Sequence, residues 1–256
     1  MDRLDSLLVK KGLVTSRTRG EYEIKNGNVL VDGKVVTKPS TKFNADVDIV
    51  INNKLDYVSK GALKLLKALE VFNIDLSNKI MLDIGSSTGG FSDVALRNNI
   101  KKVIAVDVGS DQFDKELKKD SRIELHENTD IRNFNIKEEI DTVTIDVSFI
   151  SVTKIIIKLE EINPKEIVLL IKPQFECGKE ISDKYKGIPL NKEVHKTVIE
   201  SVIKSFENIG YNINGLTYSP ITGGSGNIEY LGYFKKDNKK EINIDVIINK
   251  AFKELK

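Results

Sequence analysis

The chain has 256 residues, of which 40% are hydrophobic and 30% charged, as in an ordinary globular protein with room for one large domain and one small one. A single cysteine excludes an internal disulfide, and two histidines beside it give little basis for a metal site, so none is expected. The charged sequence MDRLDSLLVKKG predicts no secretory leader, and no apolar run reaches the roughly 18 residues of a membrane span. We therefore expect a cytoplasmic protein without membrane contact. The net charge of +2 does not by itself indicate nucleic acid.

The first 55 residues predict a small α+β domain. Leucines at helical spacing indicate a first helix that stops at Gly12, and Ser16 is placed as the N-cap of a second short helix that ends at Asn26-Gly27. The run VLVDGKVV predicts a hairpin around Asp32-Gly33, and residues 41–52 alternate like a further strand. The expected order is helix, helix, hairpin, strand.

A glycine-rich turn is the centre of the larger part of the chain. The sequence KIMLDIGSSTGGFSD at 79–93 reads as a buried strand, a turn and the start of a helix. The spacing is not that of a dinucleotide-binding loop, and an acid inside the strand suits a ligand with an amino group, such as S-adenosylmethionine (SAM). A glycine-rich turn of another kind of α/β protein is the alternative. The expected cofactor residues here are Asp83, Gly85, Ser87, Gly89 and Gly90.

Polar side chains then follow the ends of successive predicted strands, where ligands bind in doubly wound sheets. Asp107 ends the run VIAVD and can accept hydrogen bonds from ribose hydroxyls. Asp130 lies in the turn after the third strand, placed to contact an adenine amino group. Asp146 ends the fourth strand near the expected reactive methyl, although a helix N-cap would also account for it. Lys172 directly follows the apolar strand EIVLLI, so its stem must emerge into the crevice.

The remaining elements complete an α/β architecture. We expect a helix at 153–165, a mobile loop over the site at 176–190, a long helix at 191–209, two adjacent strands and a terminal helix at 240–255. This order favours a Rossmann-like seven-stranded methyltransferase sheet. The expected division is a small domain at 1–55, a linker and first helix at 56–70, and a methyltransferase domain at 71–256.

Two resemblances sharpen this interpretation. The pattern RLDSLLVKKGL, SRTRG and VLVDGKVVTKP is similar to the alpha-L RNA-binding module. The motifs YVSKGALKL, LDIGSSTGGFSD, DVSFIS, LIKPQFE and SGNIEY resemble the TlyA family, whose members join that module to a methyltransferase domain of the FtsJ type and methylate the ribose 2′-hydroxyl of cytidine in ribosomal RNA. The resemblance implies SAM as cofactor, ribosomal RNA as partner, and RNA contacts by Arg3, Ser16, Arg17, Arg19 and Lys60.

The resemblance also implies a catalytic tetrad of Lys64, Asp146, Lys172 and Glu229. It assigns Lys172 as the base and Lys64 as its charged partner, with the two acids holding the lysines; the residues alone leave open which lysine loses its proton. The large-subunit RNA is the favoured target, with both subunits as the alternative. A membrane-active haemolysin, a name often given to this family, and an RNA-binding protein with an inactive methyltransferase domain remain as alternatives. The sequence gives no basis for predicting the oligomeric state.

Overall fold

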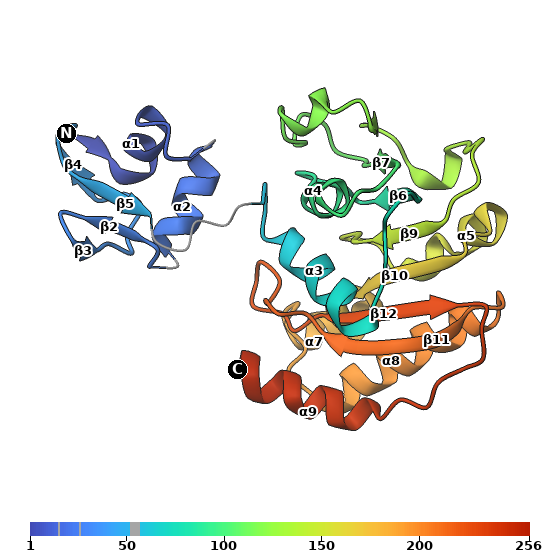
Figure 1. The fold of residues 1–256 in the computed structure, drawn as a ribbon. Coiled ribbons are helices and arrows are strands. Elements are labelled where there is room, and N and C mark those ends of the chain that lie inside the picture. Colours follow the sequence, from blue (N-terminus) through green and yellow to red (C-terminus); the bar gives the residue numbers. More distant parts are fainter. Residues whose placement is uncertain (15, 26, 52–56) are drawn as a thin grey trace. The chain divides into compact units, whose positions relative to one another are not determined.

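In the computed structural model the chain folds as two units, Met1–Ser59 and Lys60–Lys256 (Figure 1). The structure describes residues 1–14, 16–25, 27–51 and 57–256. Three expected boundaries lie outside the described residues. They are the domain boundary between residues 55 and 56, the end of the second helix at Asn26, and the end of the alternating strand at residue 52.

The first unit packs its helices against small antiparallel sheets. Asp32 and Gly33 both have positive φ, 49° and 75°, as a two-residue hairpin turn requires, and they join β2 to β3. The single strand expected at 41–52 is in fact two, because β4 pairs with β1 whereas β5 pairs with β2. The elements are β1 (Asp2–Arg3), α1 (Leu4–Lys10), α2 (Arg17–Lys25), β2 (Val29–Val31), β3 (Lys34–Val35), β4 (Lys42–Phe43) and β5 (Ile49–Ile51).

The second unit is built on a seven-stranded sheet in the order β11-β12-β10-β9-β6-β7-β8. Strand β12 runs antiparallel to both of its neighbours, and the other pairings are parallel. The chain leaves β6 towards β7 and β8, then returns to β9 on the other side, so the carboxyl ends of β6 and β9 form a switch point. The strands are β6 (Ile80–Ile84), β7 (Lys102–Val106), β8 (Ile123–His126), β9 (Thr142–Ile145), β10 (Glu166–Ile171), β11 (Asn212–Tyr218) and β12 (Tyr230–Lys235).

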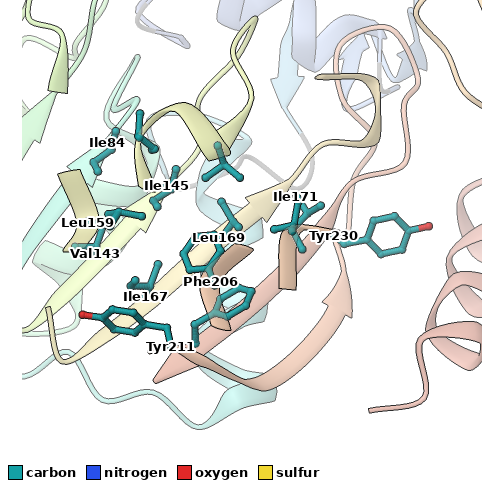
Figure 2. Packing of buried hydrophobic residues seen from close by; sticks show 14 of the residues in the cluster. Ile84, Val143, Ile145, Leu159, Ile167, Leu169, Ile171, Phe206, Tyr211 and Tyr230 are labelled. Carbon is teal, nitrogen blue, oxygen red and sulfur yellow. The ribbon is translucent and has the colours of Figure 1, made fainter. Parts of the chain in front are cut away.

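Helices cover both faces of this sheet, which explains why β9 and β10 are buried at every residue. One face packs against α5, α8 and α9, and Figure 2 shows side chains of this core, including Ile145, Leu169 and Phe206. On the other face α3 contacts α4, β11 and β12, so it belongs to the second unit. The helices are α3 (Gly61–Phe72), α4 (Gly90–Arg97), η1 (Leu117–Lys119), η2 (Ile131–Asn133), η3 (Val152–Lys154), α5 (Ile156–Ile162), α6 (Pro173–Glu176), α7 (Lys179–Lys184), α8 (Lys192–Glu207) and α9 (Ile244–Leu255).

The loop expected at 176–190 is partly helical. Residues Lys179–Lys184 form α7, and two hydrogen bonds anchor the segment that follows it. His195 of α8 bonds the Pro189 carbonyl oxygen at 2.7 Å, and Asn227 donates to the Gly187 carbonyl oxygen at 3.1 Å. This segment therefore has fixed contacts with α8 and with the turn before β12.

Candidate active site

A cavity of about 470 Å³ opens at the carboxyl ends of β6, β7 and β9. Gly85, with φ +82°, lets the backbone after β6 lie close to that after β9, because a Cβ there would lie 2.7 Å from the Asp146 carbonyl oxygen. Of the expected cofactor residues, Gly85, Ser87, Asp107 and Asp130 line the cavity. A larger groove of about 960 Å³ runs between α8 and residues 239–245, away from these strand ends.

Asp107 is fixed by the backbone around it. One carboxylate oxygen accepts a hydrogen bond from the Ser87 amide and the other from the Gly109 amide, both at 2.7 Å. Both bonds orient the carboxylate at the cavity edge, directly after β7. The prediction that it binds ribose hydroxyls is compatible with this place.

Asp130 lies at the cavity wall but already has a partner. Its carboxylate accepts from the Arg132 amide at 3.0 Å and pairs with the Arg132 guanidinium at 2.6 Å. An adenine amino group would have to share an acceptor that Arg132 occupies. The neighbouring Ile131 is buried and also lines the cavity, so it offers a ligand an apolar contact that the sequence interpretation missed.

Asp83 does not line the cavity, contrary to the expectation that it holds the amino group of a ligand. Its side chain is 1% exposed and accepts hydrogen bonds from Ser92 Oγ at 2.8 Å and Thr144 Oγ1 at 2.9 Å. Burial raises the pKa of Asp83 to about 6, against the effect of these two donors. The carboxylate therefore ties β6 to α4 and β9. Gly89 and Gly90 start α4 and do not line the cavity either.

The four residues of the expected tetrad do come together, in one chain of alternating charges. Lys172 Nζ lies 2.6 Å from Asp146 Oδ1, Lys64 Nζ lies 3.5 Å from Asp146 Oδ2, and Lys64 Nζ lies 2.9 Å from Glu229 Oε2. They come from α3, from the residues that follow β9 and β10, and from the residue before β12. Since Asp146 also lines the cavity, the charge chain begins at the cavity wall.

The two lysines are buried in this chain, with side-chain exposures of 11% for Lys64 and 7% for Lys172. Burial lowers the pKa of Lys64, but the carboxylates of Asp146 and Glu229 more than offset it, so that pKa lies above its usual value. Lys64 is therefore a cation at neutral pH.

Several side chains that the sequence interpretation missed support the tetrad. Gln174, 9% exposed, donates from Nε2 to Glu229 Oε1 at 3.1 Å, and Lys172 donates to Ser148 Oγ at 2.9 Å. A Cβ on Gly223 would lie 2.6 Å from Glu229 Oε1, so glycine there leaves room for the acid. The sequence did offer a signal for these residues. Gln174 and Ser148 lie in the motifs LIKPQFE and DVSFIS beside tetrad residues, and Gly223 lies in the glycine-rich turn before β12.

Phe149 is the most unusual residue at the cavity wall. Its side chain is 92% exposed, its φ is +63°, and its ring lies 5.2 Å from that of Phe175. A bulky residue in the left-handed region is strained, and strain of this kind gathers at functional sites. The ring is therefore presented to whatever enters the cavity mouth.

The residues expected to bind RNA have different environments. Arg3 and Arg17 both pair with the buried Asp5 and stay 42% and 56% exposed. Arg19, by contrast, is 12% exposed: it pairs with the buried Glu23 at 2.5 Å and donates to the Tyr57 carbonyl oxygen at 3.3 Å, so its side chain is largely engaged within the protein. Ser16 accepts from the Arg19 amide at 3.2 Å as the predicted N-cap, and Lys60 stands at the start of α3.

The described residues offer no cluster of three or more histidine, cysteine or acidic side chains that could hold a metal ion. Within the same residues, no helix is both long and apolar enough to span a membrane.

Comparisons with known proteins agree with this geometry. Residues 57–236 match the model of the FtsJ-like methyltransferases, and residues 2–49 match the S4 domain. A 23S rRNA (cytidine-2′-O)-methyltransferase TlyA of Campylobacter jejuni is 37% identical, over 90% of this chain and 98% of its own. The 16S/23S rRNA (cytidine-2′-O)-methyltransferase TlyA of Mycobacterium tuberculosis is 32% identical, over 94% of this chain and 92% of its own.

The likeness extends to a solved structure. A Streptococcus thermophilus protein that was solved under the name of a hemolysin superposes with a TM-score of 0.77 at 37% identity, covering 99% of this chain and 96% of that one. The fold, the matched models and these relatives confirm the recognition made from the motifs. This chain belongs to the FtsJ-like methyltransferases, with an S4 domain preceding the methyltransferase domain.

Proposed function

We propose that this protein transfers the methyl group of SAM to the 2′-oxygen of a cytidine ribose in ribosomal RNA, with the large-subunit RNA as its target. The observation that carries the proposal is the Lys172–Asp146–Lys64–Glu229 chain of charges at the wall of the cavity. A ribose hydroxyl is a weak nucleophile, and a buried pair of lysines beside carboxylates provides a base and a fixed cation for activating it.

The residues of the cavity fit SAM. Its volume of about 470 Å³ lies in the range of small-molecule sites, and its walls combine apolar side chains with a few placed polar groups. Asp107 would accept from the ribose hydroxyls of the cofactor, while Val108 and Ile131 would contact the adenine ring. Ser87 and Gly85 would line the part nearest β6. When bound, SAM supplies an electrophilic methyl group on a sulfonium.

The charge chain divides the work of the reaction. Lys64 keeps its proton because its two carboxylate partners raise its pKa, so we assign it as the fixed cation. We assign Lys172 as the base: it must first release its own proton to solvent, and its neutral amine would then take the proton of the ribose O2′ as that oxygen is methylated. Lys64 then stabilises the negative charge that develops on O2′. Asp146 orients both lysines, and Glu229 holds Lys64.

The exposed ring of Phe149 supports a nucleoside substrate. Proteins that act on single RNA nucleotides commonly stack an unpaired base on an aromatic side chain. Phe149 lies at the cavity wall, and its neighbour Phe175 follows Lys172 by three residues. A base stacked there would bring its own ribose close to the tetrad.

The choice of cytidine and of ribosomal RNA rests on the names of the two relatives, both of which are cytidine-2′-O-methyltransferases. The S4 domain supports a structured RNA as partner, since Arg3 and Arg17 present cationic groups on its surface. The Campylobacter relative is named for 23S rRNA alone, which supports the large subunit as the target.

The product tests the proposal directly. Ribosomal RNA from a strain without the gene would be incubated with enzyme and methyl-labelled SAM, then digested with alkali. A 2′-O-methyl group blocks attack on the adjacent phosphate, so we expect a labelled alkali-stable dinucleotide with cytidine on its 5′ side. Lys172→Ala should give none, while the control Lys165→Ala, which alters a lysine paired with Asp141 at the amino ends of the strands, should give the wild-type yield. Label on a base, or in protein, would refute the proposal.

A further inference from the structure

The buried carboxylate of Asp5 is an unusual feature of the S4 domain. Its side chain is 0% exposed, whereas the arginine side chain that pairs with it is 42% exposed. Oδ2 accepts from Arg3 Nη2 at 2.6 Å and lies 3.4 Å from Arg17 Nη2, while Oδ1 accepts from Arg3 Nε at 3.1 Å and from the Ser6 amide at 2.7 Å. Both carboxylate oxygens are therefore occupied from within the domain.

The two arginines meet at this one carboxylate from different elements. Arg3 precedes α1 and Arg17 begins α2, and both Nη2 atoms lie within 3.4 Å of the same oxygen of Asp5. Their guanidinium groups are thus neighbours, although like charges repel. Arg3 uses its Nε–Nη2 edge for Asp5, which turns its Nη1 side away from the carboxylate.

The electrostatics favour an anion at this place. Hydrogen bonds from Arg3 hold the pKa of Asp5 well below its usual range, despite the opposing effect of burial. Asp5 is thus ionised at any physiological pH and balances one of the two arginines, while Glu21 also interacts electrostatically with Arg3. The arginine side chains are 42% and 56% exposed, so a ligand can reach them.

We propose that Asp5 is a positioning residue that holds Arg3 and Arg17 as a preorganised pair for one phosphate of the RNA backbone. Guanidinium groups recognise phosphate through paired N–H donors, and a side chain fixed in advance loses less entropy on binding. The inference rests on the proposed RNA substrate and adds a role for an acid, a residue type that ordinarily weakens RNA binding. Arg19 shows the contrast, because its carboxylate partner Glu23 leaves it largely covered.

The proposal predicts that removing the negative charge of Asp5 weakens RNA binding, the opposite of the usual effect. Removing an acid from an RNA-binding surface normally strengthens binding, since it adds net positive charge. Asp5→Asn should instead weaken the binding of the full chain to unmodified large-subunit ribosomal RNA by roughly tenfold, the factor of one lost hydrogen bond between charged groups. The slope of log K against log salt should become shallower by about one.

The control is Asp46→Asn, the same charge change at an exposed acid of the same domain. It should leave affinity unchanged or slightly higher. In single-turnover assays Asp5→Asn should require more RNA for half-maximal rate while the maximal rate and SAM affinity stay at wild-type values. A variant that merely damaged the second unit would lower the maximal rate.

Arg3→Lys decides the matter if Asp5→Asn fails to fold. It keeps the charge but loses the paired donors, so weaker RNA binding supports the proposal and wild-type binding overturns it. Wild-type affinity of a folded Asp5→Asn, or an affinity matching that of Asp46→Asn, also overturns it. If the unaltered protein itself preferred duplex DNA to this RNA, the proposed function would fail instead, which is a distinguishable result.

Discussion

The buried carboxyl group of Asp83 gives the sharpest quantitative expectation. Its ordinary pKa is 3.8, and burial in the folded protein raises it to about 6. The unfolded chain therefore loses this proton at lower pH than the folded chain does. Between pH 4 and 6 the folded state binds more protons, so the free energy of unfolding falls as pH rises through this range. At about 1.4 kcal/mol for each unit of pKa, the fall amounts to about 3 kcal/mol and is complete above the folded pKa.

Asp83→Asn removes this titration while keeping a side chain that can bond Ser92 and Thr144. The quantity to measure is the stability of the variant minus that of the wild type, which should rise by about 2.4 kcal/mol from pH 4 to pH 7. Other groups titrate in both proteins and cancel. Calorimetry on the full chain would follow the transition that added SAM raises, which identifies the second unit, and about 2–4 °C per kcal/mol is expected for a unit of this size.

A hydroxyl deletion provides the matched test. Ser92→Ala removes the donor that bonds Asp83 at 2.8 Å and favours the ionised form, so the pH-dependent fall should move to higher pH. Asp75→Asn, at an exposed acid of the same unit, should leave the difference from wild type without a step near pH 6. A difference between Asp83→Asn and the wild type that stays flat from pH 4 to 7, or that falls, would refute the reasoning.

Three further expectations concern the charge chain. Lys64→Met should lower kcat roughly a hundredfold to a thousandfold, because it removes the cation that we propose stabilises O2′, and calorimetry should show SAM affinity unchanged. Near-normal turnover would contradict the assigned role. Gln174→Leu should lower kcat about tenfold without affecting SAM affinity, since Glu229 loses the hydrogen bond at 3.1 Å that orients it. A variant kcat equal to that of the wild type would show that the ion pair with Lys64 alone orients Glu229. Gly223→Ala should also lower kcat, because its Cβ would meet Glu229 Oε1 at 2.6 Å, whereas Gly224→Ala, with open space around it, is the control and should match the wild type.

The fold could be predicted because its signals are local, and the resemblance to the TlyA family named the four tetrad residues, whose catalytic roles stay a prediction. Strand ends, the glycine turn and the motifs that hold Lys64, Asp146, Lys172 and Glu229 can each be identified from a few adjacent residues. The sheet brings Asp146 and Lys172 together because the carboxyl ends of the neighbouring parallel strands β9 and β10 share an edge. Lys64, by contrast, comes from α3, and Glu229 from the residue before the antiparallel strand β12. Which lysine pairs with which carboxylate depends on side-chain positions that the spacing of the motifs along the sequence does not determine.

Other side chains needed the tertiary structure. Asp83 was expected at the ligand, but it points to the α4 face of the sheet, opposite Leu82 and Ile84, as alternation along a strand requires. Arg19 was expected at the RNA surface, although Glu23 four residues later offered a partner on the same helix face. Gln174 was missed because only the turn into α6 brings it back to Glu229.

The place of β12 between β10 and β11 has a consequence for how the protein is made. Lys64 and Glu229 are 165 positions apart in the chain, and they meet only when β12 has paired with β10. During synthesis the strands that form the cavity, β6 to β9, leave the ribosome well before Glu229 does. A nascent chain can thus complete the cavity at β6 to β9 while it still lacks the full charge chain. Catalytic competence arrives with one of the last strands, after the ribosome has made almost the whole domain.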